Sequence, residues 1–179
     1  MAWSHTLNLV GNEEWWLCVL LRLGAVAACT ERVQVGLSVM VLPHRHPVLT
    51  AKMLASLDRL CEGRLLVGTG VGWMQEELDA LNAPYHQRGA LSDDYLQAMN
   101  TLRTMKRASY EGRFVQFPPL GCYPKPVQQP HPPLLIGGHS PAALRHATLS
   151  GRAGTPLACC RRFGKGMRLT SRTVGIRSS

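Results

Sequence analysis

The sequence predicts an α/β fold in which parallel strands alternate with helices. Three short runs of aliphatic and β-branched residues, at positions 32–42, 65–67 and 134–136, have the composition of strands buried on both faces. Segments of helical composition separate these runs along the chain. Because such alternation requires a crossover between successive strands, we expect one parallel sheet with right-handed connections.

Two helices and a bulged strand are expected in the first part of the chain. The apolar part of a helix at residues 13–30 is too short to span a bilayer, and acidic residues precede it. A core helix therefore fits this segment better than a membrane span or a signal peptide. The strand at 32–42 contains Gly36 and Ser38, which indicates a bulge near its end. A second helix, at residues 48–61, carries an apolar stripe at helical spacing.

The second part of the chain is expected to contain three helices and a hairpin. A helix follows the second strand at residues 73–81, and its Glu77 is expected to face solvent. Ser92 is expected to cap the N-terminus of the next helix. A small hairpin is predicted at residues 109–117, and a final helix at 142–149 follows the third strand.

Charge and cysteine content restrict the function classes. The net charge is +9, but residues 151–179 hold seven Lys or Arg and no acid, so residues 1–150 carry only +2. We therefore expect one domain at 1–150 followed by a basic, irregular tail, and this distribution argues against a nucleic-acid-binding face. No Cys/His group has the spacing of zinc ligands, so no metal site is expected. Cys18, Cys29 and Cys61 are expected to be reduced core residues of a cytoplasmic protein.

The end of the second strand is the first candidate binding site. Gly68, Gly70 and Gly72 follow one another at alternate positions, so bare backbone is expected at the carboxyl end of a strand. Parallel α/β proteins bind their ligands at such ends, and a flat ring or a phosphate can approach where no Cβ intervenes. The G-x-G-x-G spacing matches neither the dinucleotide motif nor a P-loop. An ordinary tight turn explains these glycines equally well.

The end of the third strand is the second candidate site. Gly137, Gly138 and His139 precede Ser140, a predicted N-cap, and Pro141, which suits the first position of a helix. Unsatisfied amides at the start of that helix would point at one spot, an arrangement that suits a phosphate. The alternative is an ordinary turn with a good cap.

Some single side chains could contribute to a site. Ser38 could donate a hydrogen bond to a ring, although a satisfied hydroxyl within a strand is the better explanation from this residue alone. His44, Arg45 and His46 could meet an anionic substrate or exchange protons, whereas a solvated loop is the favoured alternative. Trp73 could form the wall of a pocket or simply pack at a helix start. No order typical of a Ser-His-Asp or Cys-His enzyme stands out.

Two long stretches carry several motifs in a common order. They are residues 30–73, TERVQVGLSVMVLPHRHPVLTAKMLASLDRLCEGRLLVGTGVGW, and residues 122–141, CYPKPVQQPHPPLLIGGHSP. Together they resemble the luciferase-like monooxygenase superfamily, and more closely its actinobacterial-type members that use coenzyme F-420. The resemblance extends from about Leu17 to about Thr148, which is most of the chain.

The resemblance implies a TIM (β/α)8 barrel that holds a flavin or deazaflavin at the carboxyl ends of its strands. It places Ser38 and Val39 at a bulge with a non-prolyl cis peptide against the ring. It places Gly70 and Gly72 along the ring, and residues 137–140 at the cofactor phosphate. The implied chemistry is hydride transfer between coenzyme F-420, or alternatively FMN, and a small organic substrate, with or without O2.

The resemblance also implies a homodimer, and no membrane contact is expected. His46 and Trp73, chosen from their positions in the sequence, are candidate substrate contacts, and the acid/base residues stay unassigned. A complete barrel needs about 250 residues, so the chain is expected to be a partial barrel without the first two and last three strands. A non-catalytic remnant of such an enzyme is therefore an alternative function. Nucleic-acid binding through the tail at residues 151–179 is a weaker alternative.

Overall fold

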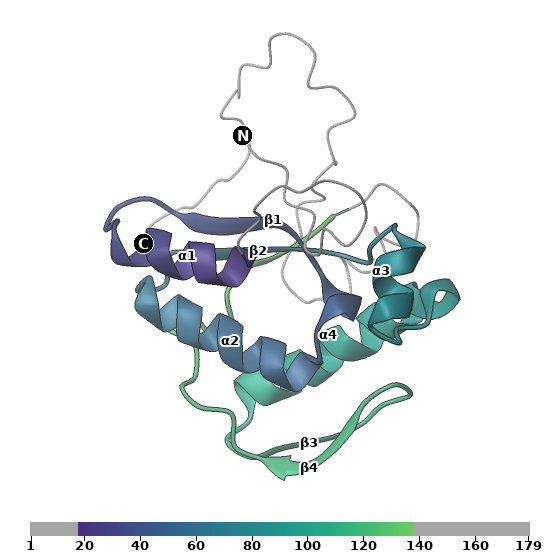
Figure 1. Ribbon diagram of the computed structural model, residues 1–179. Helices are drawn as coiled ribbons and strands as arrows, with labels where there is room; N and C mark the ends of the chain where they lie inside the picture. The colour runs from purple at the N-terminus through teal and green to yellow at the C-terminus, as the bar shows by residue number, and fades with distance from the viewer. Residues whose placement is uncertain (1–17, 138–179) are drawn as a thin grey trace, which may run out of the picture.

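A computed structural model of the chain describes residues 18–137 and contains the predicted parallel sheet (Figure 1). Helices and strands alternate up to α3, α4 then follows without an intervening strand, and a small separate hairpin precedes the last strand. In chain order the elements are α1 (Val19–Ala28), β1 (Val35–Val41), the 3-10 turn η1 (Leu42–His44), α2 (Pro47–Leu60), β2 (Leu65–Gly70), α3 (Gln75–Ala80), the 3-10 turn η2 (Tyr85–Gln87), α4 (Arg88–Thr104), β3 (Ala108–Glu111), β4 (Gln116–Leu120) and β5 (Leu134–Ile136).

The main sheet has the strand order β1-β2-β5, and both pairings are parallel. Leu65 of β2 lies opposite Val35, and Val67 lies opposite Leu134. All four of these side chains are buried, as the apolar composition of the three runs predicts. β2 continues to Gly70, beyond the predicted end at residue 67, because its backbone keeps pairing with β1 past the bulge. The prediction of an α/β fold with parallel strands is confirmed.

Helices α1, α2 and α4 lie together on one side of the sheet (Figure 1). Their apolar faces and the sheet share one core, in which Leu54, Leu65, Val67, Met99 and Leu102 are almost fully buried. Burial of each such side chain contributes about 1.5–3 kcal/mol relative to an exposed position. This packing fixes the sheet on the helices, and with it the positions of the strand ends.

The start of α4 differs from the prediction. The helix begins at Arg88 and not at Ser92, because the η2 turn leads directly into it. Ser92 is fully buried inside the helix, where its hydroxyl donates to the carbonyl oxygen of Arg88 at 2.7 Å. The prediction of Ser92 as an N-cap is therefore wrong, and its hydroxyl is satisfied by the preceding turn of the helix.

The predicted hairpin is confirmed as the antiparallel pair β3–β4, which lies beneath α4 in Figure 1. Asp94 of α4 holds it through three hydrogen bonds. The carboxylate accepts from the hydroxyl of Tyr110 at 2.7 Å and from the amides of Phe114 and Val115 at 2.7 and 3.1 Å. Burial and the Asp94 carboxylate both raise the pKa of Tyr110 above its ordinary value.

The cysteine prediction is confirmed only in part. The described cysteines are all free thiols, and Cys61 is buried in the core. Cys18 and Cys29, however, are exposed at the two ends of α1, so their assignment to the core is wrong. α1 ends at Ala28, before Cys29, and only its inward positions, such as Leu20, reach the core. Across residues 18–137 the structure has no helix with the length and apolar character of a membrane span.

Candidate functional site

The site is built on the bulge of β1. The register of β1 against β2 shifts between Leu37 and Met40, and the peptide bond between Ser38 and Val39 is cis. The bulge and the non-prolyl cis peptide predicted by the family resemblance are therefore both present. Ser38 is exposed at this point, whereas Val39 is half-buried. The bulge thus presents a hydroxyl group and re-aims the strand before η1.

Two glycines at neighbouring strand ends lie against Val39. A Cβ built on Gly70 would come 3.0 Å from one Val39 methyl, and a Cβ on Gly137 would come 2.9 Å from the other. A side chain at either position would press on Val39, so the two glycines leave room for the bulged side chain against the ends of β2 and β5. The carboxyl ends of all three strands meet here, as predicted. The direction in which a side chain would leave Gly70 or Gly137 is filled by Val39, and contact of these glycines with a ring stays a prediction.

The turn after β2 is the second part of the site. Gly72 has a φ of +78°, which favours glycine, and a Cβ there would come 2.9 Å from a Val41 methyl. Trp73 follows at the tip of the turn, and 66% of its surface is exposed among the described residues. This aromatic side chain therefore lies just beyond the carboxyl end of β2, and its role as a pocket wall stays a prediction.

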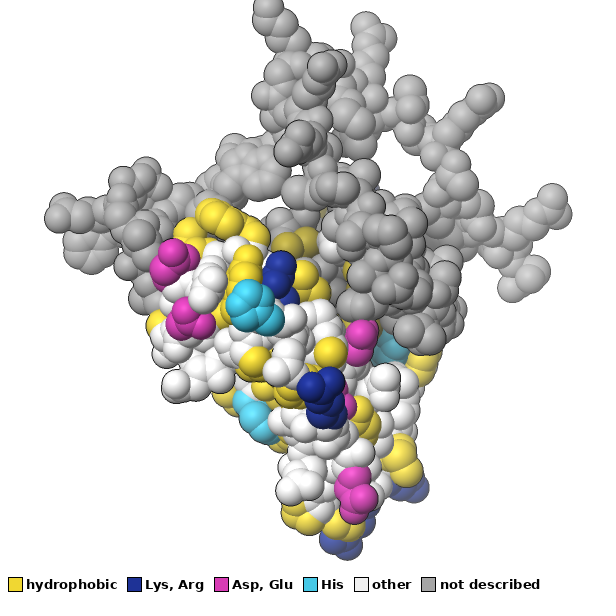
Figure 2. All heavy atoms as spheres, turned by 90° about the vertical axis from the view of Figure 1, so that its right-hand side faces the viewer, with side chains coloured by type: hydrophobic (Ala, Val, Ile, Leu, Met, Phe, Trp, Pro, Cys, Tyr) yellow, Lys and Arg dark blue, Asp and Glu magenta, His cyan; other side chains and the backbone are white. Residues whose placement is uncertain are grey.

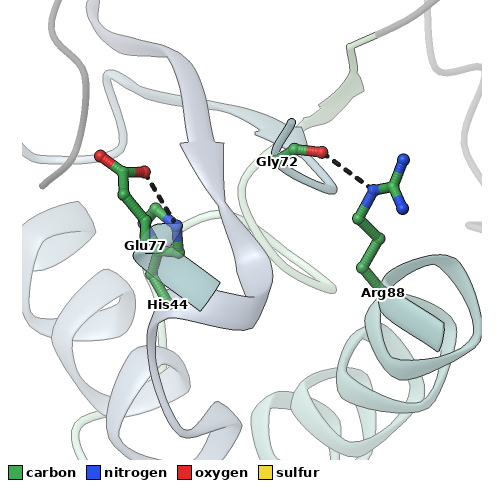
Figure 3. Close-up of polar contacts among 4 residues, drawn as sticks. All are labelled: His44, Gly72, Glu77 and Arg88. Carbon is green, nitrogen blue, oxygen red and sulfur yellow. Dashed lines mark hydrogen bonds and ion pairs between the residues drawn. The ribbon is translucent and has the colours of Figure 1, made fainter. Parts of the chain in front are cut away.

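A buried histidine–carboxylate pair joins the turns after β1 and β2. Nε2 of His44, in η1, lies 3.4 Å from Oε2 of Glu77, in α3, and both side chains are buried (Figure 3). The prediction that Glu77 faces solvent is wrong. The acidic residues of α3 did not predict a contact between Glu77 and His44, because only the packing of α3 against η1 brings the two side chains together.

The protonation state of His44 follows from its surroundings. Burial, with a smaller contribution from the charge of Arg45, lowers the pKa of His44 to about 4. The ring is therefore neutral near pH 7, and we assign the tautomer with its hydrogen on Nε2, the nitrogen that faces Oε2 of Glu77. Nδ1 is then a buried acceptor, and it has no hydrogen-bond partner among residues 18–137.

The remaining predicted site residues are distributed as follows. His46 is exposed at the start of α2, and its ring centre lies 6.5 Å from that of Tyr95. Gly138, His139 and Ser140, the predicted phosphate loop, lie outside the described residues.

On the face that carries α3 and the start of α4, basic, acidic and histidine side chains are mixed with hydrophobic ones (Figure 2). No group of three His, Cys, Asp or Glu side chains within residues 18–137 could hold a metal ion.

Residues 10–157 match the sequence profile of the luciferase-like monooxygenases, a match that includes every described element. The chain belongs to the luciferase-like monooxygenase family. It is 42% identical over 115 residues to an uncharacterized protein of Mycobacterium tuberculosis, covering 64% of this chain and 40% of that one. It is 34% identical over 122 residues to the FMNH2-dependent dimethylsulfone monooxygenase of Pseudomonas putida, covering 66% of this chain and 33% of that enzyme.

Solved structures of luciferase-like proteins share the fold. A monooxygenase from Streptomyces bottropensis superimposes with a TM-score of 0.68 at 31% identity, over 72% of this chain and 40% of that one. The coenzyme F-420-dependent tetrahydromethanopterin reductase of Methanopyrus kandleri gives a TM-score of 0.64 at 20% identity, over 73% and 42%. This luciferase-like chain thus spans about 40% of the length of the relatives that it resembles. It corresponds to part of their barrel, as predicted.

Proposed function

We propose that this chain binds a flavin-type cofactor at the carboxyl ends of β1, β2 and β5, and that it serves hydride transfer to or from a small organic substrate. The observation that carries this proposal is the bulge of β1 at Ser38 and Val39, which lies where the carboxyl ends of three parallel strands meet. It supports the site because parallel barrels bind ligands at this edge and because the family relationship implies a ring against such a bulge.

The residues at this edge suit an aromatic ring with a polar rim. Val39 offers an apolar surface, and the exposed hydroxyl of Ser38 can donate to a ring heteroatom or carbonyl. When bound, the cofactor would supply the hydride chemistry, while the protein orients it and limits access of water. Trp73 and His46 are proposed as substrate contacts, since both are exposed near the turns that follow the strands.

The buried His44–Glu77 pair presents a neutral imidazole near pH 7. His44 with a pKa of about 4 stays neutral near pH 7, so its Nδ1 is available as an acceptor. Glu77 fixes the orientation of the ring through Nε2. We propose that this pair keeps a fixed acceptor next to the site and does not carry a permanent positive charge there.

The proposed cofactor is coenzyme F-420, with FMN as the alternative. The quoted motifs favour F-420, whereas the 34% identical relative is named as FMNH2-dependent. Separate titrations of the purified full chain with F-420 and with FMN, followed by fluorescence, would distinguish them. Circular dichroism must first show that the protein is folded. Saturable binding of either cofactor supports the proposal, and a folded protein that binds neither refutes it.

The phosphate loop is tested by Gly138→Val, which we expect to abolish cofactor binding because a branched side chain would block close approach to the backbone. Gly24→Val is the matched control, since a Cβ on Gly24, in α1, meets nothing within 4 Å. Unchanged affinity in the Gly138 variant would refute the phosphate assignment.

A second function, that of a non-catalytic remnant, is favoured by one observation. Within residues 18–137, β1 and β5 form the two edges of an open three-stranded sheet. A folded chain that binds neither F-420 nor FMN would support this alternative. A homodimer remains part of the proposal, and sedimentation of the folded protein would test it.

A further inference from the structure

Two side chains, one from η2 and one from the start of α4, hold the turn after β2. Nε of Arg88 donates to the carbonyl oxygen of Gly72 at 3.1 Å (Figure 3), and the hydroxyl of Tyr85 donates to the carbonyl oxygen of Trp73 at 3.2 Å. Two successive carbonyl groups of the turn are therefore bound by side chains that lie more than ten residues further along the chain. These contacts are tertiary and do not arise from the local turn itself.

Arg88 and Tyr85 also support each other. The guanidinium group lies over the Tyr85 ring, 4.1 Å from its centre, and Nη1 donates to the carbonyl oxygen of Tyr85 at 2.9 Å. One planar guanidinium group thus joins the η2 turn and the turn after β2, which a lysine side chain cannot do with the same fixed geometry. The donors are oriented before any ligand arrives.

The turn is held from its other side by β1. Gly72 lies so close to Val41 that no side chain fits between them, and its positive φ sets the direction of the backbone into Trp73. The backbone at Gly72 and Trp73 is therefore held between β1 on one side and η2 and the start of α4 on the other, while the indole stays largely exposed. A large exposed aromatic side chain on a fixed backbone suits stacking against a flat ligand.

We infer that Arg88 and Tyr85 are positioning residues that fix Trp73 at the edge of the cofactor and substrate site. This inference rests on the proposed function for the identity of the ligand, whereas the role of Arg88 and Tyr85 in holding the turn does not depend on it. The arrangement needs no contact between Arg88 and the ligand, because its guanidinium group acts on the carbonyl of Gly72. Loss of Arg88 would let the turn shift, and a displacement of about 1 Å at a site lowers its efficiency strongly.

The test combines amide hydrogen exchange with cofactor titration on the full chain. In Arg88→Ala we expect exchange of the amides at residues 71–75 to rise about tenfold, since a charged hydrogen bond is lost there. Affinity for whichever of F-420 or FMN the wild type binds should fall about tenfold. Arg88→Lys should recover only part of both values, and Tyr85→Phe should raise exchange in the same segment.

Arg107→Ala is the matched control, because it removes an exposed arginine just beyond the far end of α4. A general loss of stability would raise exchange throughout the core, whereas the proposed role changes it at residues 71–75. Unchanged exchange there in Arg88→Ala, or wild-type values in Arg88→Lys, overturns the inference. So does increased exchange with unaltered cofactor affinity. A wild type that binds neither cofactor refutes the proposed function, and the exchange measurement still decides whether Arg88 holds the turn.

Discussion

Replacing Gly68 with alanine is expected to separate β1 from β2 at the bulge. The new Cβ would lie well inside van der Waals contact with the carbonyl oxygen of Leu37, and 3.3 Å from both the Leu37 carbonyl carbon and the Ser38 Cα. All three atoms belong to the backbone of the paired strand, so no side-chain rotation can relieve the overlap. The strands must move apart, and this movement weakens their hydrogen bonds and the core beneath them.

The size of the effect follows from this geometry. Extra methyl groups forced into a packed interior cost about 1–3 kcal/mol, and a rigid backbone neighbour places Gly68→Ala in the upper part, at about 2–3 kcal/mol. For a chain of this size the corresponding decrease in Tm is roughly 4–12 °C. Cofactor affinity is expected to fall as well, because the displaced atoms belong to the bulge that carries Ser38.

Urea unfolding followed by circular dichroism provides the assay. Gly36→Ala is the matched control on the opposite strand, where a Cβ would come 3.4 Å from the Leu66 Cβ, which is ordinary contact. We expect that control to stay within about 0.5 kcal/mol of the wild type. Equal unfolding midpoints for the Gly68 and Gly36 variants would show that close approach of the two backbones does not require glycine at position 68.

Two further predictions concern the titrating and buried groups. The pKa of His44 is about 4 in the folded chain against an ordinary 6.5, so between these values the unfolded chain binds a proton that the folded chain does not. Stability should therefore be greatest above pH 6.5 and decrease as the pH falls to about 4. Urea midpoints should show a smaller decrease in His44→Gln, and an equal decrease in both proteins would contradict this assignment. Asp94→Ala removes the acceptor of three hydrogen bonds and should cost about 3 kcal/mol of unfolding free energy. The pKa of Tyr110 should fall toward its ordinary value in an absorbance titration, whereas Asp79→Ala, which removes an exposed carboxylate, should change neither quantity.

The strands and the bulge could be predicted from local sequence. Runs such as 65–67 and 134–136 are too short for helices and too apolar for loops, so composition alone identifies them as buried strands. Gly36 and Ser38 interrupt a β-branched run, which is a local sign of irregular pairing. The strands and the bulge depend on residues that are neighbours in the sequence, so the local sequence pattern predicts them.

The contacts between elements could not be predicted in this way. Glu77 has the pattern of an exposed helical acid, and only the packing of α3 beside η1 buries it against His44. Ser92 has the character of a capping residue, yet the η2 turn extends α4 upstream and leaves this side chain inside the helix. Nothing in the sequence around Arg88 indicated its contact with Gly72, because the two residues lie in separate segments that only the fold brings together. Each case is decided by the relative placement of two segments.

Val39 of β1 packs against the ends of two paired strands that are far apart in the sequence, and its two methyl groups fill the volumes left by Gly70 and Gly137. These three positions therefore share a single small space. An enlargement at any one of them has to be matched by a reduction at another, so they are expected to vary together among related proteins. The bulge of β1 thereby acts as a spacer that sets how closely the tips of β2 and β5 can approach it.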